Sequence, residues 1–263
     1  MATPTLADLI SALLVQNLPP PHATFLTPIL TPSSASQRLP PLPALAATAK
    51  HRLLSSDFTC PNILDANKAL AFPPNITDVK VVEKRLGWDI VVQVLDVEDV
   101  GRSKWEQIEG LESERKGETT KGRQVIRVVT QDGDEEPSTA ASQALGSTSN
   151  QNAQQKKSTG PFKVLLQDFK GGKAYGFELR RLEKIGYPGS GAGAMGIGCK
   201  ILLKKGAKVA RGMVLLEPSS AMVLGGKIES LDKEWREGRE RSLRDAVGDG
   251  KGRHEEVEDD GPD

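Results

Sequence analysis

Three glycines in the second half of the chain have the spacing of a dinucleotide-binding loop. Gly191, Gly193 and Gly196 form G-x-G-x-x-G, a pattern whose backbone amides approach a pyrophosphate at the start of a helix. Glu217 follows at a distance suited to a ribose-binding acid. The residues after Gly196 nevertheless alternate with period two and turn at 205–206, which predicts a β-hairpin. Since no helix N-terminus would then face the phosphates, we interpret the segment as a flexible connection between strands.

Other catalytic or metal-binding arrangements are missing from the sequence. The three histidines, His22, His51 and His254, lie far apart, and none is placed to activate a serine or cysteine nucleophile. Cys60 and Cys199 have neither metal-ligand nor disulfide spacing, which fits a reducing compartment. We therefore expect a protein that is not an enzyme and that uses no cofactor, no metal and no small-molecule substrate.

The composition gives no global electrostatic reason to bind nucleic acid or a membrane. There are 35 basic and 35 acidic side chains, so only a local patch can supply such a function. No apolar run approaches the length of a membrane span, and no basic region precedes an apolar core at the N-terminus. We expect neither membrane association nor a secretory signal.

One local patch of basic side chains does exist, between residues 200 and 211. Binding of single-stranded nucleic acid needs such a groove together with exposed aromatic rings. The basic residues of the patch are Lys200, Lys204, Lys205, Lys208 and Arg211. Phe162, Tyr175 and Phe177 fall on apolar strand faces and are expected in the core, which leaves Trp105, Phe169 and Tyr187 as exposed candidates. The patch is either a nucleic-acid surface or the solvated face of a sheet.

The period-two alternation that predicts strands begins at residue 87 and recurs along the rest of the chain. In GWDIVVQV, Trp88, Ile90, Val92 and Val94 alternate with polar residues, among them Gln93. Five strands are predicted, at 88–98, 162–167, 175–180, 197–204 and 208–216. Five short strands with glycine-containing turns indicate a mainly β fold with helical additions, a small five-stranded barrel of the OB type.

Helices and loops complete the predicted organisation of the chain. Helical spacing indicates helices at 5–16, 42–55, 62–71 and 226–246, and Thr5 with Asp8 resembles a capping box. Prolines argue against regular structure between 17 and 41. The division is a helical N-terminal region with a Pro-rich linker (1–80), an OB-fold domain (81–247) and a disordered acidic tail (248–263).

The connection between the first two strands, 99–161, is far longer than a hairpin loop. Connections of this length are usually functional or disordered. Residues 99–116 are compatible with a helix, 124–129 with a short strand, and 131–160 are rich in polar and small residues and read as flexible. A protein partner can bind to a projecting element of this kind.

The segment GCKILLKKGAKVARGMVLLEPSSAMVLGGKIESLDKEW, 198–235, resembles the family of RecQ-mediated genome instability protein 1, in a fungal form. It carries in order a G-x-K-I-L-L strand, a G-x-x-L-L-x-P strand end, a V-L-G-G turn and an acidic helix with its aromatic residue. The segments 165–172 and 87–112 resemble the second strand and the first strand with the start of its inserted loop. Leu53, Leu54 and Asp57 resemble the family's L-L-x-D, with an extra serine.

This resemblance implies a non-catalytic subunit of a nuclear complex with topoisomerase III and a RecQ-type helicase, which dissolves recombination intermediates. The barrel is expected to dock on the topoisomerase, with the inserted loop reaching its DNA gate, and DNA is expected to be contacted weakly or through the complex. The expected partner contacts are Ser103, Trp105, Gln107 and Lys200. Lys200 can also be read as a solvated strand residue, and Trp105 as packing back onto the barrel.

The alternative function is an autonomous OB-fold protein that binds single-stranded DNA. It rests on the basic patch, with Lys204, Lys205, Lys208 and Arg211 as the expected nucleic-acid contacts. Partner binding rests instead on the inserted loop, so the two hypotheses place the functional surface at different parts of the barrel.

Overall fold

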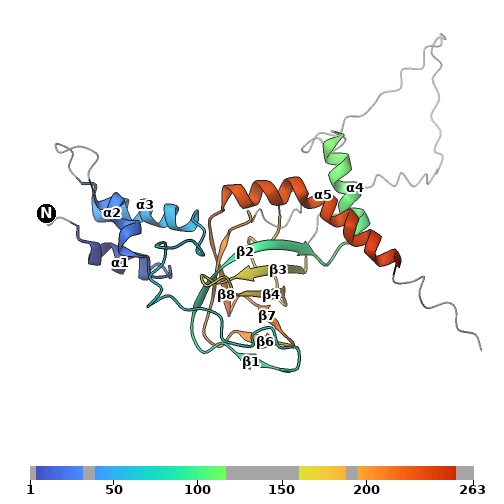
Figure 1. Ribbon diagram of the computed structural model, residues 1–263, viewed down its shortest axis with the longest axis horizontal. Helices are drawn as coiled ribbons and strands as arrows, with labels where there is room; N and C mark the ends of the chain where they lie inside the picture. Colours follow the sequence, from blue (N-terminus) through green and yellow to red (C-terminus); the bar gives the residue numbers. More distant parts are fainter. Residues whose placement is uncertain (1–3, 32–38, 117–159, 188–194, 253–263) are drawn as a thin grey trace, which may run out of the picture.

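The computed structural model describes residues 4–31, 39–116, 160–187 and 195–252. Figure 1 shows three N-terminal helices beside a strongly curled sheet, with the C-terminal helix lying across the sheet. The helices are α1 (Leu6–Leu14), α2 (Ala23–Leu30), α3 (Leu42–Leu54), α4 (Lys104–Arg115) and α5 (Glu229–Gly252). None of the helices in the described ranges is long and apolar enough to cross a membrane.

The sheet has eight strands in the order β1-β6-β7-β4-β3-β2-β5-β8. β4 and β7 are parallel, and every other neighbouring pair is antiparallel. The strands are β1 (Lys84–Arg85), β2 (Ile90–Asp99), β3 (Phe162–Gln167), β4 (Lys173–Glu178), β5 (Lys200–Leu203), β6 (Lys208–Ala210), β7 (Met213–Leu216) and β8 (Ala221–Gly225). The curled sheet forms a half-barrel, so the expected mainly β fold with helical additions is confirmed.

The predicted single strand at 208–216 is wrong, because the chain turns back in its middle. Arg211 and Gly212 both have positive φ, 49° and 79°, which is the backbone of a tight hairpin turn. β6 and β7 therefore pair with each other, with Val209 opposite Val214. Position 212 requires glycine, because its backbone is left-handed and a Cβ would lie 2.6 Å from the Thr77 carbonyl oxygen.

β2 is buried on both faces, which the predicted alternation did not anticipate. Ile90, Val92 and Val94 point into the half-barrel, as expected. On the other face, Val91 packs among the side chains of the N-terminal helices, and Gln93 is fully buried. The helices α1–α3 thus dock on the outside of β2 and β5, and they share one apolar cluster with Val91 and Leu202. Trp88, expected inside, is 40% exposed before the strand begins.

The facing of β4 is the reverse of the expected one. Tyr175 and Phe177 were expected in the core, but Tyr175 is 45% exposed and Phe177 only half-buried. The inward positions hold Ala174, Gly176 and Glu178. The interior has no room for larger groups, because a Cβ on Gly176 would lie 3.0 Å from methyl groups of Leu166 and Val164.

Two other aromatic assignments have opposite outcomes. Phe162 is fully buried, as expected. Tyr187, expected to be exposed, is 93% buried with its ring edge-on to Phe162 at a centroid distance of 6.2 Å. The neighbouring glycine loop, 188–194, lies outside the described residues. After it the chain continues into β5 rather than into a helix, as predicted.

The helical predictions are partly confirmed. α1 has the Thr5–Asp8 capping box, and α3, α4 and α5 lie where helical spacing indicated. The Pro-rich region is not without structure: α2 forms there around Pro28, because burial of Leu26 and Ile29 outweighs the lost backbone hydrogen bond. The expected helix at 62–71 is wrong, since this stretch consists of turns and one bridge from Leu64 to Pro21.

The predicted acidic tail is helical at its start. α5 continues to Gly252, so residues 248–252, which were predicted to belong to a disordered tail, are helical. The expected short strand at 124–129 and most of the flexible stretch at 131–160 lie outside the described residues, as do residues 253–263.

Gly226 marks the closest approach between the helical region and the barrel, and its substitution is our first prediction. Its φ is +86°, and a Cβ would lie 2.3 Å from the Leu54 carbonyl oxygen at the end of α3. Gly206 has nearly the same φ, +87°, but open space around it. We expect Gly206→Ala to lower the free energy of unfolding by about 1–2 kcal/mol through backbone strain alone. Gly226→Ala should cost about 2 kcal/mol more because of overpacking.

Urea denaturation of both variants measures this difference. The pair is matched for backbone conformation, so the excess loss in Gly226→Ala reports the contact with α3. Equal losses in the two variants would show that the helices do not pack on the barrel as described.

Candidate functional site

The inserted segment leaves the barrel at Asp99 and returns at Phe162, two residues that pair with each other across β2 and β3. We call the surroundings of these two residues the root of the insertion. The amide of Val100 donates to the carbonyl of Pro161 at 3.0 Å, which extends the pairing beyond the strands. Gly101 is needed here, because a Cβ would lie 2.2 Å from the Gly160 carbonyl oxygen. The first and last described parts of the insertion are therefore fixed together.

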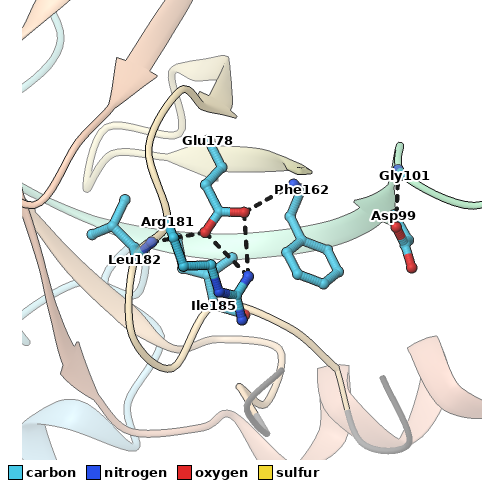
Figure 2. Close-up of polar contacts among 7 residues, drawn as sticks. All are labelled: Asp99, Gly101, Phe162, Glu178, Arg181, Leu182 and Ile185. Atoms are coloured by element: carbon cyan, nitrogen blue, oxygen red, sulfur yellow. Dashed lines mark hydrogen bonds and ion pairs between the residues drawn. The ribbon is translucent and has the colours of Figure 1, made fainter. Parts of the chain in front are cut away.

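Glu178 organises one side of the root, as Figure 2 shows. Its buried carboxylate accepts hydrogen bonds from the amides of Phe162 at 3.2 Å and Leu182 at 2.8 Å. The Arg181 guanidinium lies 3.3 Å from the same carboxylate and also donates to the carbonyl of Ile185. Glu178 thus ties the start of β3 to the loop that follows β4. Sequence reasoning missed it, because its place in an alternating strand resembled that of a solvated acid.

Ser103 begins α4, the first element of the insertion. Its hydroxyl accepts from the amide of Glu106 at 3.2 Å, and the Glu106 carboxylate accepts from the Ser103 amide at 3.0 Å. This reciprocal pair is a capping box, which satisfies two amides that have no partner inside the helix. The structure thus gives Ser103, an expected partner contact, a role in starting the helix, while leaving it exposed.

Gln107, another expected contact, is buried and joins three segments. Its side-chain amide nitrogen donates to the carbonyls of Asp99 at 3.0 Å and Arg102 at 3.1 Å. Its oxygen accepts from the guanidinium of Arg239 on α5 at 3.1 Å. With only 4% of its surface exposed, Gln107 holds the end of β2, the turn after it and α5 together rather than facing a partner. The expectation that it is a direct contact surface is wrong for this arrangement.

Arg239 is stacked between aromatic rings. Its guanidinium lies 3.4 Å from the ring centroid of Tyr187 and 4.7 Å from that of Trp235. The hydroxyl of Tyr187 in turn donates to Asp99 at 3.3 Å, and the Trp235 indole donates to Asp96 at 2.6 Å. Burial raises the pKa of Tyr187 and lowers that of Arg239. Stacking on the rings offsets part of the cost of burying the guanidinium.

α4 and α5 are further connected at their outer ends by charges. Arg244 contacts Glu112 of α4 as well as Glu240 of α5, and Arg115 lies 3.5 Å from Glu240. These side chains are all partly exposed to solvent, so each pair adds little stability on its own. Together with the buried Gln107–Arg239 contact they hold the two helices against each other, as seen at the upper right of Figure 1.

Trp105 is the exposed feature of this assembly. Its indole is 54% exposed on the first turn of α4, so the interpretation that it packs back into the barrel is wrong. Val100 and Leu179, next to the two chains of the root, are 49% and 50% exposed. Three apolar side chains thus lie near a rigid framework without being buried by it. Among the four expected contacts, Ser103 and Trp105 are exposed, and Trp105 offers a partner the larger apolar surface.

Lys200 is fully buried, which corrects both interpretations made from the sequence. Its ammonium donates to the carbonyl of Gly198 at 2.6 Å and lies 4.7 Å from the ring centroid of Phe58. The helical region covers it, so it is neither solvated nor able to touch a partner while α1–α3 are docked. Burial lowers the pKa of Lys200 to about 8, although the charge of Asp57 opposes this.

A polar network links this lysine site to β2. Gln93 accepts from the amide of Phe58 at 3.1 Å, and its own amide donates to Asp57 at 2.8 Å and to Gln167 at 3.0 Å. Partial burial would raise the pKa of Asp57, but the hydrogen bonds from Gln93 and Thr59 and the charge of Lys200 hold it below its ordinary value. The Leu53–Leu54–Asp57 segment, noted for its resemblance, thus lies at the contact between helices and barrel.

Comparison with known proteins matches both parts of this arrangement. The model of the RMI1 N-terminal OB-fold domain matches residues 72–239, and that of the RMI1 N-terminal helical domain matches residues 14–59. The chain belongs to the RMI1 family. It is 31% identical over 149 residues to RecQ-mediated genome instability protein 1 of Schizosaccharomyces pombe, an alignment that covers 56% of this chain. The chain spans 59% of the length of that relative.

Membership of the RMI1 family settles the fold class. The half-barrel is an OB-fold domain, as the sequence predicted. The OB-fold match ends at Arg239, so it includes the whole root of the insertion and its anchor on α5. The helical match ends at residue 59, just after Asp57 and Phe58.

The remaining predicted contacts lie at another end of the barrel. Lys204 and Lys205 are in the turn between β5 and β6, Lys208 begins β6, and Arg211 is in the turn between β6 and β7. All four are at least partly exposed. They do not belong to the root of the insertion, and their role as nucleic-acid contacts stays a prediction.

Replacement of Lys200 by methionine should change how stability depends on pH. The pKa of Lys200 is about 8 in the folded protein, below its ordinary value of 10.5. Between these pH values the unfolded chain binds more protons, so the folded state gains stability as pH rises through this window. Lys200→Met lacks this gain. Its free energy of unfolding relative to the unsubstituted protein should therefore fall by about 3 kcal/mol from pH 7 to pH 10.5.

Urea denaturation at several pH values tests this. Lys205→Met, at an exposed position in the turn after β5, controls for the loss of one lysine charge. The same pH-dependent difference in both variants would contradict a special environment for Lys200.

Proposed function

We propose that this chain is a non-catalytic scaffold subunit that binds topoisomerase III and a RecQ-type helicase in the nucleus and supports genome stability. Family membership across the OB-fold domain carries the proposal, and the relative's name refers to both RecQ and genome instability. The subunit would act in the dissolution of recombination intermediates, by promoting strand passage and decatenation by the topoisomerase.

The geometry of the root supports this role in a specific way. A projecting segment binds a partner more tightly when its base is already ordered, because less conformational entropy is lost on association. Gln107, Arg239 and Glu178 order the base through buried hydrogen bonds. α4 then presents Trp105 at the start of the insertion, and tryptophan is among the residues that contribute most to protein interfaces.

We assign different roles to the barrel and to the insertion. The barrel and α5 form the platform that docks on the topoisomerase, and the insertion extends from the platform toward the DNA gate. The helices α1–α3 pack on the opposite side of β2 and leave the root accessible for binding.

Substitution of Trp105 tests the proposed interface. We expect Trp105→Ala to weaken binding to topoisomerase III at least tenfold, since central tryptophans typically contribute more than 1.4 kcal/mol. Its melting temperature should stay close to that of the unsubstituted protein, because the indole is more than half exposed. Isothermal titration calorimetry at physiological salt measures the affinity.

Trp88→Ala is the matched control, because it removes a second partly exposed tryptophan that precedes β2, at the end of that strand away from the root. It should bind the topoisomerase as the unsubstituted protein does. Unchanged binding by Trp105→Ala would remove α4 from the interface. Failure of the unsubstituted chain to bind either topoisomerase III or a RecQ-type helicase would overturn the scaffold proposal itself.

A further inference from the structure

A second surface lies at the edge of the sheet, away from the root. β1 pairs with β6, which places Arg85 directly opposite Lys208. The loop before β1 is fastened to the β6–β7 turn by the amide of Arg211, which donates to the Val81 carbonyl at 3.0 Å. The loop after β1 is fastened in the same way, because the Gly206 amide donates to the Leu86 carbonyl at 2.8 Å. We call residues 78–89 and 204–211 together the β1–β6 edge.

Pairing of these two segments concentrates positive charge. The β1–β6 edge carries seven cations and three carboxylates, a net charge of +4 in a chain whose total is zero. The cations are Lys80, Lys84, Arg85, Lys204, Lys205, Lys208 and Arg211. The first three come from a segment that showed no basic run, so sequence reasoning found only the other four. All seven are at least partly exposed.

The three carboxylates do little to neutralise this charge. Asp78 accepts from the amide of Lys80 at 2.9 Å, and Asp89 accepts from the amide of Lys205 at 2.6 Å. Both acids thus serve the backbone of turns. Within the described ranges, the one carboxylate within 4.0 Å of any of the seven cations is that of Glu83, which lies 3.8 Å from Arg85 with both side chains exposed.

The pairing of Arg85 with Lys208 destabilises the edge of the sheet, and the fold does not require it. Like charges directly opposite each other in an antiparallel pair are destabilising, and Arg85 faces Lys208 in this way. A lysine on an edge strand protects against unwanted pairing, which accounts for a charge on β1. Protection of the edge does not account for the opposing cation on β6 or for those in the two turns. An anion that lies across both strands would offset the repulsion.

Trp88 gives this edge an aromatic surface. It lies between β1 and β2 and is 40% exposed. Its indole nitrogen donates to the Ala71 carbonyl at 3.1 Å, which fixes the orientation of the ring. The next residue, Asp89, accepts from the backbone amide of Lys205, which connects this segment to the β5–β6 turn and its cations. Exposed aromatic rings on which bases stack, next to cations that contact phosphates, are what binding of single-stranded nucleic acid requires.

We propose that the β1–β6 edge binds single-stranded DNA, with Trp88 stacking on a base and the seven cations contacting phosphates. A fixed aromatic ring favours unpaired bases over a duplex, whose bases are already stacked on each other. The edge lies at the bottom of Figure 1, whereas α4 and its root lie at the upper right. Protein and DNA can therefore be held by the same chain at separate surfaces.

Fluorescence anisotropy with a labelled twenty-nucleotide oligothymidine tests the proposal. We expect binding to the purified full chain that weakens steeply with salt, because phosphate contacts release counterions. The double variant Arg85→Glu and Lys208→Glu should lose at least tenfold in affinity and show a smaller dependence on salt. Trp88→Ala should lose about tenfold with an unchanged salt dependence, and Trp88→Phe should recover part of that loss.

The matched control reverses two charges on another element. Lys233→Glu and Arg241→Glu on α5 change the net charge equally at exposed positions, and oligothymidine affinity should stay within twofold. Equal loss in both double variants would mean that net charge alone attracts the strand. Thermal melting confirms that each variant is folded.

Three further outcomes would overturn the proposal. These are no binding at 50 mM salt, tighter binding to a duplex of the same length, and loss of binding to phosphatidylserine vesicles by the edge variants with oligothymidine unaffected. Trp105→Ala should bind oligothymidine normally. The result is therefore independent of whether the chain binds topoisomerase III.

Discussion

Strand β2 is covered on both faces, and the rest of the structure follows from the hydrogen bonds that this burial demands. A buried amide or carbonyl without a partner costs about 1–3 kcal/mol, so every polar group on or beside the strand has to be matched. At one end Gln93 bonds Asp57 and Phe58 of the helical region. At the other end, the carbonyl of Asp99 accepts from Gln107 of the insertion. One strand thereby positions the helices, the barrel and the inserted segment relative to each other.

The two buried cations in the described part of the chain are accommodated by the same means. Lys200 and Arg239 lie against aromatic rings and donate to uncharged oxygens, while the nearest acids remain at a distance or serve other groups. A direct ion pair would require two desolvated charges, whereas a ring and a carbonyl require only one. The lysine is charged at neutral pH at a cost, which its lowered pKa records. The contact between helices and barrel is for this reason less stable than its apolar area suggests.

Period-two alternation predicted β2, β3, β4 and β5 because each of these strands has at least one apolar face. It could not predict the split at Arg211, since the pattern of KVARGMVLL continues through a turn that only backbone conformation reveals. It also reversed β4, where the crowded interior favours Ala174 and Gly176 over the aromatic residues. Sequence pattern reports polarity, whereas the available volume inside the barrel decides which face turns inward.

The candidate site shows the same limit in electrostatic terms. Polar residues in an alternating strand or a charged helix were taken as solvated or partner-facing, but Lys200, Gln107 and Glu178 are buried by elements distant in sequence. Their partners, in the turns after α3, on α5 and in the loop after β4, come together only in the folded chain. The exposed residue Trp105 was placed by a local signal, the start of a helix, which a sequence does carry. Residues that build the site are thus hidden from sequence reasoning, whereas the exposed Trp105 is accessible to it, because exposure leaves a side chain with few distant constraints. Lys80, Lys84 and Arg85 are exposed too, but only the pairing of β1 with β6 brings them beside the predicted basic patch.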